Sequence, residues 1–102
     1  MNYIKSPAIK FKLTRFSEFK IVENYCHQAC YDQIQHTYEI YPRTYADKYS
    51  VVEGFTLMDG TFVDREKAIT IAKNADQLKD TYSSASSLES HMLKFFGGHY
   101  EN

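Results

Sequence analysis

Residues 51–77 read VVEGFTLMDGTFVDREKAITIAKNADQ, and this stretch decides the fold. The dipeptide Asp59-Gly60 separates two apolar runs, and this arrangement is a strong signal for a β-hairpin. Asp64 follows the second run, where its carboxylate suits the N-cap of a helix beginning at Arg65. The apolar residues that then recur at helical spacing are Ala68, Ile69, Ala72 and Ala75. The stretch therefore predicts two strands followed by a capped helix.

The N-terminal part of the chain repeats this order of elements. Three apolar residues alternate with polar ones, which predicts a half-buried strand. These residues are Ile9, Phe11 and Leu13. Residues 19–22 predict a partner strand, and Asn24 suits the N-cap of a helix over residues 25–40 that Pro42 ends. Residues 43–50 have no period and predict a loop.

The two halves together predict a single α+β domain over residues 1–102 with the order ββα-ββα. Two β-hairpins would form a small antiparallel sheet with both helices packed on one face. Residues 87–96 would add a short helix or an irregular tail. The other face of the sheet would stay exposed or available to a partner, and aromatic residues on it would favour a homodimer.

The composition is that of one globular domain, since 102 residues can bury one modest core. The net charge of −1 gives no drive toward nucleic acid or anionic lipid, so we expect neither partner. The first residues alternate charged and apolar side chains. They lack the continuous apolar segment of a secretory signal or a membrane span, which predicts a cytoplasmic protein.

Cysteine and histidine residues raise the question of a metal site. Cys26 and Cys30 share a helix face, and His27 lies beside them, so His91 or His99 could complete a zinc site. No CxxC pair is present, and a small buried cysteine commonly fills a helical core. We therefore expect structural cysteines, no metal and no cofactor.

Catalytic patterns are missing from the sequence. The chain has no GxSxG elbow, Walker loop or GxGxxG, and adjacent helical residues such as Cys26 and His27 point about 100° apart. We therefore expect a protein that is not an enzyme. Arg65, in the first turn of its helix, could help to hold a phosphate or carboxylate. The alternative, which the sequence favours, is an ion pair with a neighbouring glutamate.

Tyrosine is abundant, with nine Tyr and seven Phe but no Trp. Tyrosine gives a large contact area with few torsions to order, so it is enriched at recognition surfaces. The alternative is that a small core recruits bulky aromatic rings. If the tyrosines serve recognition, the contact surface consists of Tyr41, Tyr45, Tyr49 and Tyr82.

The central motif resembles one found in small phage and prophage proteins, which typically read GFxTxxGRFVxRxEAxxIAxxAGQ. The matching positions here are Gly54, Phe55, Gly60, Phe62, Val63, Arg65, Ala68, Ala72, Ala75 and Gln77. The resemblance extends to phage inhibitors of Thoeris defence, oligomeric sponges that sequester cyclic nucleotide signals. It implies ligand contacts at His27, Phe55 and Arg65, with the aromatic ring stacking on a base and the arginine meeting phosphate.

Three departures from the sequences of these phage proteins weaken the hypothesis that the chain binds a cyclic nucleotide. Thr61 stands where the pattern has arginine, and Asp76 replaces its glycine. In these phage proteins a helix that opens with Arg-His precedes the pattern, and Cys26 stands at the position of that arginine. Losing two cations should weaken nucleotide capture by several kcal/mol, at about 1.5–3 kcal/mol for each charged hydrogen bond. The sequence thus predicts an anti-CRISPR-like protein that binds and inhibits a bacterial immune protein in the host cytoplasm. The alternatives are a cyclic-nucleotide sponge and a phage structural or regulatory protein unrelated to defence.

Overall fold

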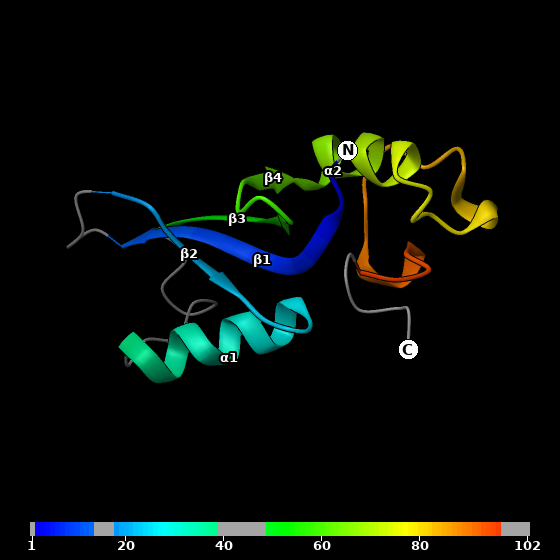
Figure 1. The fold of residues 1–102 in the computed structure, drawn as a ribbon. Helices are drawn as coiled ribbons and strands as arrows, with labels where there is room; N and C mark the ends of the chain where they lie inside the picture. The colour runs from blue at the N-terminus through cyan, green and yellow to red at the C-terminus, as the bar shows by residue number, and fades with distance from the viewer. Residues whose placement is uncertain (1, 14–17, 39–48, 97–102) are drawn as a thin grey trace.

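The computed structural model describes residues 2–13, 18–38 and 49–96 of the chain. The described residues form four strands, two α-helices and two short 3-10 helices (Figure 1). In chain order these elements are β1 (Ile4–Leu13), β2 (Lys20–Glu23), α1 (His27–Tyr38), β3 (Tyr49–Leu57), β4 (Phe62–Asp64), α2 (Arg65–Asn74), η2 (Asp80–Tyr82) and η3 (Ser90–Met92). The predicted order of two strands and a helix, repeated once, is confirmed.

The four strands form one antiparallel sheet in the order β2-β1-β3-β4. This confirms the predicted α+β class. Strand β1 begins at Ile4, earlier than the alternation from Ile9 predicted. It contains Pro7, which the sequence places at the opening of the domain. Strand β2 pairs only with residues 8–11 of β1, so the proline lies past the end of this partner and removes no hydrogen bond to it.

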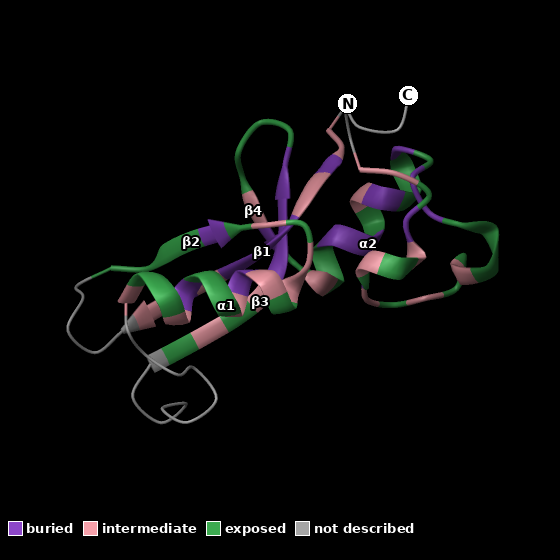
Figure 2. Cartoon of the chain, turned by 90° about the horizontal axis from the view of Figure 1, so that it is seen from below, coloured by how far each residue is buried: buried purple, intermediate pink, exposed green. Residues whose placement is uncertain are grey.

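Strand register places one set of side chains beneath both helices. Ile9 pairs with Val22 of β2 and with Glu53 of β3, and Phe55 of β3 pairs with Val63 of β4. Paired residues point to the same side of a sheet, so these five share one face. The residues that α1 and α2 pack toward this face are Cys30, Ile34, Ala68, Ile69 and Ala72. Register and packing thus place both helices against one face of the strongly twisted sheet. The two helices lie toward opposite ends of the sheet (Figures 1 and 2).

Helix α1 begins at His27, two residues later than predicted. The N–H of Ala29 donates to Sγ of Cys26 at 3.4 Å, so Cys26 takes the capping position. The side-chain oxygen of Asn24 accepts instead from the N–H of Tyr25 at 2.9 Å. The predicted cap residue therefore orders the turn before the helix rather than its first turn.

Residues next to helix α2 determine where it begins and ends. Oδ1 of Asp64 accepts from the N–H of Lys67 at 2.8 Å, which confirms the predicted cap. After the last helical residue, Asn74, the chain turns through Asp76 in the left-handed region at φ 54°. Aspartate is among the few side-chain-bearing residues that adopt this conformation readily, so it can replace the glycine of the phage pattern.

The hairpin between β3 and β4 also follows the prediction. Gly60 has φ 92°, and the N–H of Thr61 donates to Oδ1 of Asp59 at 2.9 Å. At Gly54, a Cβ atom would collide with the backbone oxygen of Val63. Only glycine therefore lets β4 approach β3 at this position.

The C-terminal segment is largely irregular, which was one of the two predicted alternatives. Within residues 87–96 only Ser90–Met92 form a helix, and it is a single 3-10 turn. Leu88 and Leu93 are nevertheless buried in the core against α2. The segment is held by burial of these side chains rather than by a regular helix.

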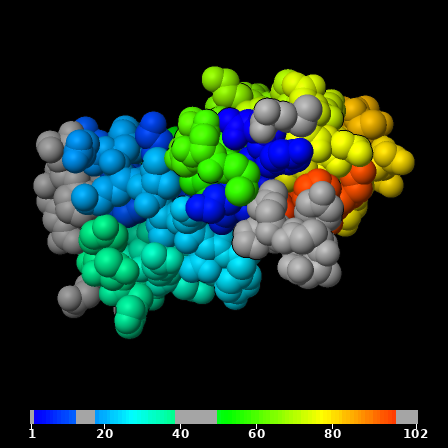
Figure 3. Space-filling view, in the orientation of Figure 1, coloured from blue at the N-terminus to red at the C-terminus, as the bar shows by residue number. Residues whose placement is uncertain are grey.

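The buried amide of Gln77 joins the two ends of the described chain. Its Oε1 accepts from the N–H of Ile4 at 2.7 Å. Its Nε2 donates to the carbonyl oxygens of Ile4, at 3.0 Å, and Phe95, at 3.2 Å. The N-terminal and C-terminal segments lie side by side as a result (Figure 3). Gln77 satisfies backbone groups of β1 as a neighbouring strand would.

Replacing Gln77 with alanine is expected to lower the free energy of unfolding by about 3 kcal/mol or more. Three hydrogen bonds are lost, and a buried polar group left unpaired costs about 1–3 kcal/mol. Urea denaturation would measure the change. The control is Gln33→Ala, which removes an exposed amide bonded to Asn24 and should change stability by no more than about 0.5 kcal/mol. Equal effects of the two substitutions would contradict the role of Gln77.

Candidate functional site

The structure brings together His27, Phe55 and Arg65, the three residues that the phage resemblance implies as ligand contacts. His27 is the first residue of α1 and Arg65 the first of α2, so the two helix N-termini meet over β3. The His27 and Phe55 rings are 5.3 Å apart, edge to face. Nη2 of Arg65 lies 3.3 Å from Nδ1 of His27. We call this group, with Glu53 and Tyr31 described below, the junction cluster.

Hydrogen bonds define the tautomer of His27. Its Nε2 lies 2.7 Å from the carbonyl oxygen of Gly54, which can only accept, so Nε2 carries a proton. Nδ1 faces the guanidinium of Arg65, which can only donate, so Nδ1 is the accepting nitrogen. A neutral imidazole therefore bridges β3 and α2.

Glu53 and Tyr31 are the residues of this cluster that the sequence did not predict. Oε1 of Glu53 accepts from Nη2 of Arg65 at 2.7 Å, and its Oε2 accepts from the hydroxyl of Tyr31 at 2.6 Å. Burial opposes ionisation of this carboxyl, but the hydrogen bonds from Tyr31 and Arg65 and the positive charge of Arg65 outweigh burial and lower its pKa. Arg65 thus forms an ion pair with a glutamate, as the sequence favoured, although the partner comes from β3.

Arg65 also holds the C-terminal segment. Its Nη1 donates to the carbonyl oxygen of Leu88 at 2.9 Å, and its own carbonyl oxygen accepts from the N–H of Leu88 at 2.8 Å. The guanidinium thus contacts acceptors from β3, α1 and the C-terminal segment. A phosphate could bind this guanidinium only by displacing these protein acceptors.

Phe55 lies beneath the cluster and is fully buried. Stacking on a nucleobase requires an exposed ring face, which Phe55 lacks in this structure. The three implied ligand contacts are therefore neighbours, but they bind one another and the core. The geometry describes a structural junction, and capture of a nucleotide would first require the junction to open.

Two of the four predicted contact tyrosines lie within the described residues. Tyr41 and Tyr45 lie outside the described residues. The backbone of Tyr49 begins β3, whereas Tyr82 ends η2 at the other end of the molecule (Figure 1). The Tyr82 ring is half-buried and lies edge to face on His91, with ring centres 5.4 Å apart. The structure does not bring Tyr82 near the start of β3, and the tyrosine surface stays a prediction.

The cysteines pack as structural residues. Cys30 is buried, with Sγ 3.8 Å from the carbonyl oxygens of Pro7 and Val22, and burial raises the pKa of its thiol to about 11. Cys26 caps α1, and His99 lies outside the described residues. Among the residues that the structure describes, no group of three or more His, Cys, Asp or Glu side chains could hold a metal ion.

The sheet face opposite the helices carries an exposed apolar group. Ile21, Lys10 and Val52 form a row across β2, β1 and β3. Ile21 is 48% exposed, Val52 39% and Phe19 42%. Nζ of Lys10 lies 5.1 Å from the centre of the Phe19 ring, and Nζ of Lys12 lies 6.0 Å from it. We call these five residues the open-face patch. The sequence predicted an available face but not which residues lie on it.

Comparison with known proteins identifies a family. Residues 3–93 match the family model described as Phage T4 y16D protein. No curated protein and no solved structure matches the chain. In the described part of the chain, none of the helices has the length and apolar character needed to cross a membrane.

Replacing Glu53 with glutamine is expected to lower the free energy of unfolding by about 2–3 kcal/mol at about pH 7, since charged hydrogen bonds are worth about 1.5–3 kcal/mol. The folded-state pKa of Glu53 lies below its ordinary value of 4.5. Its stabilising contribution is therefore complete above that pH and is lost as pH falls through the folded-state pKa. Urea denaturation of both proteins at about pH 7 and about pH 3 should show the difference shrinking in acid.

The matched control for this experiment is Glu66→Gln, which neutralises an exposed carboxylate in the first turn of α2. We expect it to cost no more than about 1 kcal/mol at about pH 7 through the helix dipole. If the Glu53→Gln difference were the same at both pH values, the ionised carboxylate would not be the stabilising form.

Alkylation should distinguish the two cysteines. In the native protein at about pH 8, iodoacetamide is expected to leave Cys30 unmodified, because the reactive thiolate is scarce at a pKa of about 11 and the side chain is buried. Any native adduct should lie on the partly exposed Cys26. In urea both thiols should react. Mass spectrometry of the native Cys26→Ser variant is the control, and rapid alkylation of that variant would show that Cys30 is accessible.

Proposed function

Because the chain belongs to the phage T4 y16D protein family, we propose that it is a phage protein that inhibits a bacterial immune protein by stoichiometric binding. The family supports the phage origin. The open-face patch supports the binding role, since it exposes three large apolar side chains together on a surface that no part of the described chain covers.

The patch differs from the ordinary outer face of a sheet. An antiparallel sheet with one covered face usually alternates apolar side chains inward and polar ones outward. Here Ile21 and Val52 point outward on either side of Lys10, and the Phe19 ring lies beneath the amines of Lys10 and Lys12. Contiguous exposed apolar residues of this kind mark interaction sites.

The charges of the patch indicate the chemistry of its partner. Lys10 and Lys12 add two positive charges beside the apolar residues. A protein surface that offers apolar side chains flanked by carboxylates would complement both features. Such a surface can be blocked by occupancy alone, without a catalytic group.

Sequestration of a cyclic nucleotide is the second candidate, because His27, Phe55 and Arg65 come together in the fold. The buried ring of Phe55 and the engaged guanidinium of Arg65 favour the protein-binding candidate instead. A structural or regulatory phage role would use the same open face on a phage-encoded partner.

Capture from cells tests the proposal. The tagged protein would be expressed in bacteria that carry an active defence system, and bound polypeptides would be identified by mass spectrometry. We expect one host immune protein in a near 1:1 ratio and restored plating of a sensitive phage. Ile21→Asp and Val52→Asp should each reduce capture at least about tenfold and abolish the plating effect, because central interface residues carry most binding energy.

Thr70→Asp is the matched control, since it places the same charge on the exposed side of α2. It should bind and protect like the wild type. Equal capture by Ile21→Asp would show that the patch is not the contact surface. A nucleotide adduct in native mass spectrometry without a captured protein would support the sponge candidate, and a captured phage polypeptide would support the structural or regulatory one.

A further inference from the structure

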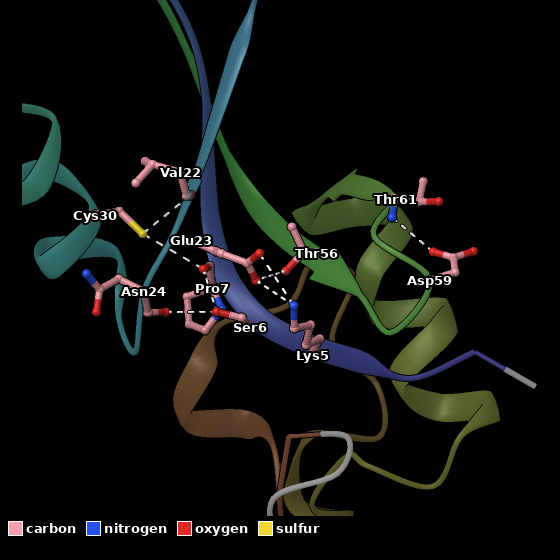
Figure 4. Close-up of polar contacts among 10 residues, drawn as sticks. All are labelled: Lys5, Ser6, Pro7, Val22, Glu23, Asn24, Cys30, Thr56, Asp59 and Thr61. Carbon is pink, nitrogen blue, oxygen red and sulfur yellow. Dashed lines mark hydrogen bonds and ion pairs between the residues drawn. The ribbon is translucent and has the colours of Figure 1, made fainter.

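An open pocket of about 370 Å³ lies where β1 begins, β2 ends and the C-terminal segment passes. The part of its lining that matters here consists of Lys5, Pro7, Glu23, Tyr25 and Phe96. Figure 4 shows the polar side of this region, with Lys5 of β1 and Glu23 of β2 directed toward each other and Thr56 beside them. This volume lies near the lower end of the range of about 300–1,000 Å³ for small-molecule pockets, and it is large enough for one aromatic side chain.

The pocket has apolar walls from three segments of the chain. Pro7 is fully buried and contributes a rigid ring from β1. Phe96 is half-buried at the end of the C-terminal segment. Tyr25 is 80% exposed, although its backbone N–H is held by Oδ1 of Asn24 at 2.9 Å. A large ring that is exposed on an ordered backbone is available to contact a ligand.

The polar rim contains one charge of each sign. Nζ of Lys5 lies 3.4 Å from Oε1 of Glu23, and both side chains are partly exposed. Oγ1 of Thr56 donates to the same Oε1 at 2.9 Å and orients the carboxylate. Its Oε2 accepts from Nζ of Lys5 at 3.5 Å. A carboxylate accepts about four hydrogen bonds, so Glu23 can accept another donor.

These features select a neutral ring over a charged ligand. Glu23 would repel an anion, and Lys5 would repel a cation. An aromatic ring with an N–H or O–H donor meets neither repulsion. It could pack on Tyr25 and Phe96, donate to Glu23 and lie beneath the Lys5 amine, as Phe19 does beneath Lys10 on the same sheet.

We propose that this pocket binds a tryptophan or tyrosine side chain of the partner protein. The pocket adjoins the open-face patch, because alternation along β2 directs Ile21 of the patch and Glu23 of the pocket to the same side of the sheet. The assignment rests on the proposed function, since the ring belongs to the protein that the patch binds. The partner would cover the open-face patch and insert one aromatic side chain into the pocket, so the two contacts would form one interface.

Titration with indole tests the pocket without the partner. In amide NMR spectra of the full chain, indole is expected to shift Ser6, Asn24 and Tyr25. Tyr25→Ala should weaken its binding at least fivefold, whereas Phe19→Ala on the open face should not change it. 1-Methylindole, which lacks the N–H donor, should bind at least threefold more weakly, and Glu23→Gln should reduce that preference. Indole shifts elsewhere, or equal binding of cyclohexanol, would overturn the assignment.

Partner capture separates this inference from the proposed function. If Tyr25→Ala weakens capture at least fivefold while indole binding is also lost, the pocket holds the anchor. Loss of capture by Ile21→Asp with unchanged capture by Tyr25→Ala would overturn the pocket assignment and leave the proposed function intact. If indole bound the pocket but the wild type captured no protein, the proposed function would fail, and with it the assignment of the ring to a partner.

Discussion

The Glu53–Arg65 ion pair is the contact on which the junction of the two halves depends. Glu53 comes from β3, Arg65 begins α2, and the same carboxylate accepts the hydroxyl of Tyr31 from α1. Arg65 continues the network to His27 and to the carbonyl oxygen of Leu88. The side chains of Arg65 and Glu53 are 28% and 35% exposed, so solvent screens this pair less than it screens a surface pair. Removing either partner would leave an uncompensated charge, which is why the pair constrains both helices and the C-terminal segment together.

Local signals predicted the elements of the fold, and non-local contacts decided their boundaries. The Asp59-Gly60 turn and the Asp64 cap depend on residues within three positions of each other, so the sequence reveals them directly. The start of β1 depends on β2 ending opposite Ala8, which makes Pro7 acceptable inside the strand. The start of α1 depends on a thiol cap from Cys26, an unusual capping group that sequence rules do not favour.

In the candidate site, too, non-local contacts decided what the sequence could not show. The structure brings together His27, Phe55 and Arg65, which the resemblance to phage proteins implied as ligand contacts, but the sequence could not show that they contact one another. Glu53 was missed because a charged residue in a strand suggests the solvent side, and only register places it beneath the helices with Ile9. The open-face residues were missed for a related reason. Alternation shows which residues share a face, but it does not show which face the helices cover.

These contacts give structural roles to several residues of the phage pattern that the chain resembles. Gly54 permits close approach of β4, Gln77 binds the backbone at both ends of the described chain, and Arg65 joins the two halves. Asp76 replaces the glycine of the pattern and keeps the left-handed backbone that the turn requires. These positions specify the scaffold, and their side chains are occupied in doing so. The open-face patch lies mainly on and beside β1 and β2, and its exposed side chains are less constrained by packing than the residues of the pattern.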